Sequence, residues 1–72
     1  MYRVIIGSPV DYEDVVAYVY LEGGCIAILD QEEGVDNIRV EFFKEGLDKV
    51  KKFNLDLLME ALLEAKRRLK GN

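Results

Sequence analysis

The sequence has no histidine, threonine or tryptophan, and only one cysteine, one proline and one serine. Without histidine, Ser8 and Cys25 lack an imidazole to activate them, so we expect no serine- or cysteine-type catalysis. A single cysteine excludes an internal disulfide and favours a reducing, cytoplasmic location. We also expect no secretion signal, and no apolar run approaches the roughly 20 residues of a membrane-spanning helix.

Sites for metals and cofactors are also scarce. Residues 30–36 are acidic, as calcium loops are, but Gly34 falls fifth instead of sixth and the twelfth residue, Glu41, falls in an expected strand. Zinc needs histidine or paired cysteines. Gly23-Gly24 precedes a strand and not the helix of a phosphate-binding loop. We therefore expect no metal, no cofactor and no enzymatic activity.

The chain is instead rich in apolar and charged residues. Of its 72 residues, 50% are hydrophobic and 33% are charged, which is typical of a folded domain and not of a disordered chain. This length allows one hydrophobic core, so residues 1–72 are expected to form a single domain.

Four strands are predicted by β-branched, aromatic and alternating segments at residues 2–6, 14–21, 25–29 and 38–42. Gly23-Gly24 suits the two central positions of a type I′ hairpin turn. Residues 31–37 are polar and predict a loop. Short connections of this kind favour an antiparallel meander.

The last third of the chain has helical periodicity. Apolar residues recur at helical spacing from Leu55 to Leu69, after Asn54, a good N-cap, and before Gly71, which suits the position after a helix. Residues 44–52 fit a loop, a helical turn or a short edge strand. The predicted fold is α+β, a four-stranded antiparallel meander with one C-terminal helix packed on one face (ββββα).

The hairpin register assigns side chains to the two faces of the sheet. The face expected under the helix carries Val15, Ala17, Val19, Leu21, Ile26, Ile28, Ile38, Val40 and Phe42. The open face carries Val16, Tyr18, Tyr20, Ala27, Leu29, Arg39, Glu41 and Phe43, with Cys25 near one corner. Exposed aromatic and apolar patches commonly mark interfaces, so this face is expected to bind a protein partner or a second copy.

The net charge of −4 is unevenly divided along the chain. Residues 1–41 hold nine acids and two bases, whereas residues 42–72 hold five acids and eight bases. In a meander the first and third connections lie at the same end of the sheet, where acids would gather: Asp11, Glu13, Asp14, Asp30, Glu32, Glu33 and Asp36. Such an end favours a basic protein partner over nucleic acid. Residues 66–70 of the helix are an alternative, intramolecular source of positive charge.

The acidic end and the aromatic face together predict a partner-binding surface. Its expected residues are Asp11, Glu13, Asp14, Tyr18, Tyr20, Leu29, Glu32, Glu33, Asp36 and Phe43. We expect contacts with a protein, and none with nucleic acid or membrane.

The chain resembles a known class of proteins in three segments, Ser8–Ala17, Asp30–Gly34 and Leu55–Leu69. They resemble small acidic immunity proteins of bacterial polymorphic and contact-dependent toxin systems. The resemblance implies a non-enzymatic inhibitor that blocks a cognate toxin, often a basic nuclease, in the cytoplasm, with acidic loops imitating phosphates. The alternatives are a phage-encoded, anti-CRISPR-like inhibitor of a bacterial defence complex, an antitoxin with a degenerate ribonuclease-H-like core, and a small homodimer of unknown role.

Overall fold

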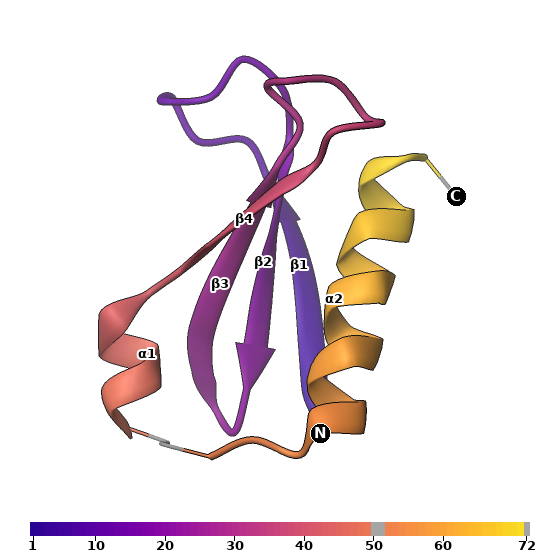
Figure 1. Ribbon diagram of the computed structural model, residues 1–72. Coiled ribbons are helices and arrows are strands. Elements are labelled where there is room, and N and C mark those ends of the chain that lie inside the picture. Colours follow the sequence, from indigo (N-terminus) through magenta and orange to yellow (C-terminus); the bar gives the residue numbers. More distant parts are fainter. Residues whose placement is uncertain (50–51, 72) are drawn as a thin grey trace.

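A computed structural model describes residues 1–49 and 52–71 of the chain. Its elements are, in order, β1 (Tyr2–Gly7), β2 (Val16–Leu21), β3 (Gly24–Asp30), β4 (Arg39–Phe42), α1 (Lys44–Lys49) and α2 (Leu55–Leu69) (Figure 1). The strands form one antiparallel sheet in the order β1-β2-β3-β4. The predicted α+β meander with a C-terminal helix is confirmed. In the segment left open by the sequence, residues 44–49 form a helix, and residues 50 and 51 lie outside the described part.

Local signals define the long helix α2. The Asn54 side chain accepts a hydrogen bond from the Leu57 N–H at 2.9 Å, which satisfies a donor of the first turn. After the helix, Gly71 has a φ of 90°, a conformation that glycine adopts without steric cost. Ala61 and Ala65 are fully buried, and their small side chains let α2 approach the sheet closely.

The hydrophobic core lies between α2 and the first three strands of the sheet. α2 packs against β1 and β2, and α1 packs against β3 (Figure 1). The buried residues of this core are Val4, Ala17, Val19, Leu21, Ile26, Ala27, Leu29, Ala61, Ala65 and Leu69. In contrast, all four residues of β4 are exposed.

The β2–β3 hairpin differs from the prediction by one residue. Its turn is formed by Glu22 and Gly23, with φ angles of 54° and 81°, and Leu21 pairs with Gly24. Two positive φ angles are the signature of a type I′ turn. The turn type is therefore as expected, but the first central position of the turn is occupied by Glu22 and not by a glycine, as had been predicted.

A β-bulge then shifts the register between the two strands. Tyr20 pairs with Cys25, but Val19 pairs with Ala27, which leaves Ile26 as an extra residue in β3. A one-residue slip moves side chains to the opposite face. Accordingly, the predicted faces of β3 are wrong beyond the bulge, as its last residues show. Leu29 pairs with Ala17 and belongs to the core under α2, whereas Ile28 pairs with Tyr18 on the open face.

Three further residues expected under the helix do not reach the core: Val15, Val40 and Phe42, the last with an exposed fraction of 43%. Val15 precedes β2 and is exposed. Val40 pairs with Leu29 and so lies on the helix-bearing face, but its exposed fraction is 44% because α2 does not extend over β4. The helix-bearing face of β4 thus borders a groove of about 240 Å³, whose other wall is formed by Leu62, Leu63 and Lys66 of α2.

Candidate functional site

Two acidic loops lie at the same end of the sheet (Figure 1). They are residues 8–15, between β1 and β2, and residues 31–38, between β3 and β4; we call them the acidic loop end. They contain no lysine or arginine. Their six acidic residues are all exposed: Asp11, Glu13, Asp14, Glu32, Glu33 and Asp36. These loops therefore carry a formal charge of −6, whereas the other residues, with eight acids and ten bases, carry +2.

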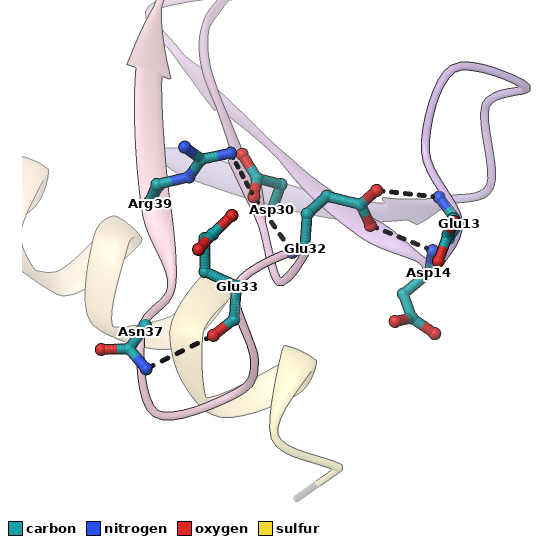
Figure 2. A network of polar contacts seen from close by, with 7 residues as sticks. All are labelled: Glu13, Asp14, Asp30, Glu32, Glu33, Asn37 and Arg39. Carbon is teal, nitrogen blue, oxygen red and sulfur yellow. Dashed lines mark hydrogen bonds and ion pairs between the residues drawn. The ribbon is translucent and has the colours of Figure 1, made fainter.

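Side chains of the second loop bind the backbone of the first (Figure 2). The Glu32 carboxylate accepts hydrogen bonds from the N–H groups of Glu13 and Asp14, at 3.1 and 3.3 Å. The Gln31 amide donates to the Val15 carbonyl at 3.0 Å. Because these contacts join residues at least 16 positions apart, they fix the two loops relative to each other.

Asp30, also expected at this end, has a structural role. Only 7% of its surface is exposed, and its carboxylate pairs with the Arg39 guanidinium at 3.6 Å and accepts the Glu32 N–H at 3.2 Å (Figure 2). A buried carboxylate with these partners is engaged mainly within the chain. It instead positions Glu32, whose own carboxylate holds the first loop.

The other carboxylates of the acidic loop end are directed to solvent. In the described part of the chain, no hydrogen bond or ion pair involves the carboxylates of Asp11, Glu13, Asp14, Glu33 and Asp36. The Asn37 side chain contacts Glu33 only through its backbone carbonyl, at 3.3 Å (Figure 2). These five charged groups can therefore meet a cationic partner without breaking an existing contact.

The basic end of α2 does not neutralise these loops by direct contact. α2 ends at the same end of the sheet as the loops (Figure 1), but Arg67 pairs with Glu64 of its own helix. Arg68 donates to the Val4 carbonyl of β1 at 2.7 Å. Among residues 1–49 and 52–71, no ion pair links residues 66–70 to the acidic loops. In this part of the chain, the charge of the loops is thus not compensated by ion pairs with the helix end.

The open face carries an aromatic patch centred on two tyrosines. Tyr18 and Tyr20 lie there half-buried. The Tyr18 ring packs on Gly7, where a Cβ atom would lie 2.8 Å from its Cε2 atom. The Arg3 guanidinium lies 5.2 Å from the centre of the Tyr20 ring, within cation–π distance. Ile5 pairs with Tyr18 and joins the patch, which the weak alternation of the first strand did not reveal.

Leu29 does not belong to this patch, and Phe43 lies away from the acidic loops. Leu29 is 4% exposed and lies in the core under α2, so its predicted place on the open face is wrong because of the bulge in β3. Phe43 follows β4 and donates its N–H to the Ile26 carbonyl at 2.8 Å, immediately before α1. This position is at the opposite end of the sheet from the acidic loops (Figure 1). Leu29 is therefore not part of the predicted binding surface, and Phe43 lies at the far end of the sheet from its acidic residues.

Tyr12 was not selected from the sequence, although it lies at the margin between the acidic loops and the open face. It lines a hollow of about 300 Å³ together with Asp30, Arg39 and Glu41. Desolvation raises the pKa of the Tyr12 phenol, and the nearby carboxylates, Glu41 first, act in the same direction. The neutral phenol is thus retained as a hydrogen-bond donor beside a negatively charged surface.

Neither helix of the described segments has the length and hydropathy needed to cross a membrane. In the same segments, no three histidine, cysteine, aspartate or glutamate side chains are grouped as metal ligands would be. No family model, curated protein or solved structure matches this chain. Its function is therefore inferred from geometry and charge.

Proposed function

We propose that this protein is a non-enzymatic inhibitor that binds a basic protein through its acidic loop end, in the manner of the immunity proteins that it resembles. One observation carries the proposal. Six exposed carboxylates and no base occupy two loops that Glu32 and Gln31 fix to each other. Because these contacts already order the loops, binding a partner costs less conformational entropy than it would for free loops.

The distribution of charge indicates how such a partner would be recognised. A concentration of negative charge attracts a basic surface over long distances and raises the association rate, an effect that salt weakens. Five of the carboxylates have no intramolecular partner in the described structure, so lysine or arginine side chains can reach them directly. A basic nuclease-like toxin, acting in the cytoplasm, is the partner that this arrangement fits best.

The proposal is tested by reversing charge at the loops without disturbing their contacts. In the variant Glu33→Lys with Asp36→Lys, both altered side chains are exposed and are free of hydrogen bonds in the described structure. The control, Glu22→Lys with Glu60→Lys, makes the same change in net charge at the β2–β3 turn and on α2. We expect the loop variant to bind the partner at least about tenfold more weakly at low salt and the control to bind normally.

The partner is first identified by affinity capture from a cell lysate at low and moderate salt, followed by mass spectrometry. A basic toxin or nuclease domain that salt releases, and that only the loop variant fails to bind, supports the proposal. Equal weakening by both variants would reject the acidic loop end as the binding surface. Subunits of a defence complex would identify the phage-encoded type of inhibitor, and an empty column would remove the main support for inhibition.

A further inference from the structure

The two edges of the sheet are protected to different degrees. On β1, the Arg68 guanidinium of α2 binds the Val4 carbonyl, and α2 packs along the strand. On β4, all four residues are exposed. β4 also lacks proline and lysine, which commonly block the edges of natural sheets. An open strand edge is a ready template for pairing with another strand.

The backbone of β4 has hydrogen-bonding groups that point to this open side. The Phe43 N–H donates to the Ile26 carbonyl of β3. Since the polar groups of successive residues in a strand point to opposite sides, those of Glu41 and Arg39 also point to β3. The N–H and C=O groups of Val40 and Phe42 consequently point away from β3, toward the free edge.

We propose that β4 pairs antiparallel with β4 of a second copy of this chain, around a two-fold axis through Val40, to form a continuous eight-stranded sheet. A two-fold axis perpendicular to the sheet keeps the same face of both copies on the same side. Residues that oppose each other across the two strands must then have side chains on the same face of the sheet. Neighbouring residues of one strand point to different faces, so an axis between two neighbours would violate this condition, and the axis must pass through a residue. β4 spans Arg39–Phe42, so an axis at either end residue would oppose only that one residue of each strand. The axis must therefore pass through Val40 or Glu41.

Charge decides between these two registers. An axis at Glu41 places two carboxylates directly opposite each other, which is destabilising. An axis at Val40 instead places Arg39 opposite Glu41 of the second copy, and this ion pair forms twice. On the helix-bearing face, the same register pairs Val40 with its own copy and Ile38 with Phe42, so apolar residues meet apolar residues.

The other charged residues near β4 are also compatible with the Val40 register. Arg39 is paired with Asp30, yet 61% of its side chain is exposed, so the guanidinium can also contact Glu41 of the second copy. Asp36 would lie at the level of Lys44 of the second copy, again with opposite charges. Antiparallel pairing also sends the two acidic loop ends to opposite ends of the sheet. Dimerisation therefore leaves both of them accessible, and the inference does not depend on the proposed function.

A charge-swap experiment tests the ion pairs. We expect the wild-type protein to sediment as a dimer, and Glu41→Arg, which opposes arginines twice, to raise the dimer dissociation constant at least about tenfold. Arg39→Glu should act likewise, but it also loses the pair with Asp30, so circular dichroism is needed to verify its fold. The double variant Arg39→Glu with Glu41→Arg restores opposite charges and should dimerise again. An equimolar mixture of the two single variants should form heterodimers.

A cross-linking experiment tests the register. In a hydrogen-bonded antiparallel pair the Cα atoms lie about 5.5 Å apart, which a disulfide can span. In a Cys25→Ala background, Val40→Cys should therefore form a cross-linked dimer on oxidation, whereas Glu41→Cys and Phe42→Cys, away from the axis, should not. Cross-linking of Glu41→Cys instead would overturn the Val40 register. A wild-type protein that is monomeric at about millimolar concentration, or a dimer insensitive to Glu41→Arg, would overturn the proposal.

Discussion

The sheet has a covered half and an open half. β1 and β2 lie directly under α2. In the other half, β3 still supplies core residues and contacts the short helix α1, but β4 is exposed throughout. The difference follows from dimensions: a helix with its side chains is about 10 Å wide, and strands are about 4.8 Å apart, so one helix covers about two strands. A chain of 72 residues with one long helix thus builds its core on β1, β2 and the buried residues of β3, and leaves β4 uncovered.

The largest effect is expected from truncating a valine in the covered half. Val19 and Val40 are both on the helix-bearing face, but Val19 is 0% exposed and Val40 is 44% exposed. Val19→Ala should lower the free energy of unfolding by about 2–3 kcal/mol, because it removes buried methyl groups and leaves a cavity. Val40→Ala should cost less than about 1 kcal/mol in the monomer, because its site can remain hydrated.

Urea denaturation at low protein concentration measures both variants. The two substitutions lower strand propensity alike, so the difference between them reports burial. Equal losses of stability would mean that β4 is covered as well as β2 is, and would contradict the division of the sheet.

A substitution at Gly46 tests how closely α1 packs on β3. A Cβ atom at this position in α1 would lie 2.3 Å from the Cys25 carbonyl oxygen of β3, a backbone atom that cannot move aside alone. Gly46→Ala should therefore push α1 away from β3 and cost about 1–3 kcal/mol, despite alanine's higher helix propensity. Gly24→Ala is the control, because its Cβ would meet nothing closer than 4.0 Å. A stabilised Gly46→Ala variant in urea denaturation would show that α1 does not contact β3 this closely.

The helix and the strands are predictable from the sequence because their signals are local. Asn54, the apolar stripe and Gly71 define α2 without reference to the rest of the chain. The register of β3 is not predictable in this way. Residues 25–29 are all apolar, so alternation cannot tell which of them point to the core. A bulge at Ile26 then reverses the faces, and this is why Leu29 was misplaced.

The candidate site is predictable in position but not in detail. A meander places its first and third connections at one end, so the cluster of acids follows from topology and charge alone. The separate roles of the acids depend on side-chain directions, which the sequence does not contain. Glu32 holds the other loop and Asp30 is buried beside Arg39, whereas Glu33 projects into solvent.

Glu32 provides a test of the connection between the two halves. Its carboxylate joins the loop that follows β3, in the open half, to the loop before β2, in the covered half. Glu32→Gln keeps the size but cannot accept both hydrogen bonds as an anion, so we expect a loss of about 1 kcal/mol and faster hydrogen exchange at the Glu13 and Asp14 amides. Glu33→Gln, with the same change in charge and no such contacts, should leave that exchange unchanged. Similar exchange in both variants would show that Glu32 does not hold the loops together.

The smallest effect concerns Cys25, a half-buried thiol at the α1 corner of the open half. Burial raises its pKa, an effect only partly opposed by its hydrogen bonds with Ala27 and Tyr20. At pH 8 the folded protein therefore holds less thiolate than a free cysteine does, and a thiol reagent should react about tenfold more slowly than with the urea-unfolded chain. The rate should keep rising with pH beyond the range in which the unfolded chain reaches its plateau. Equal rates in the folded and unfolded chains would show that α1 does not shield this corner, and that the open half extends to β3 as fully as to β4.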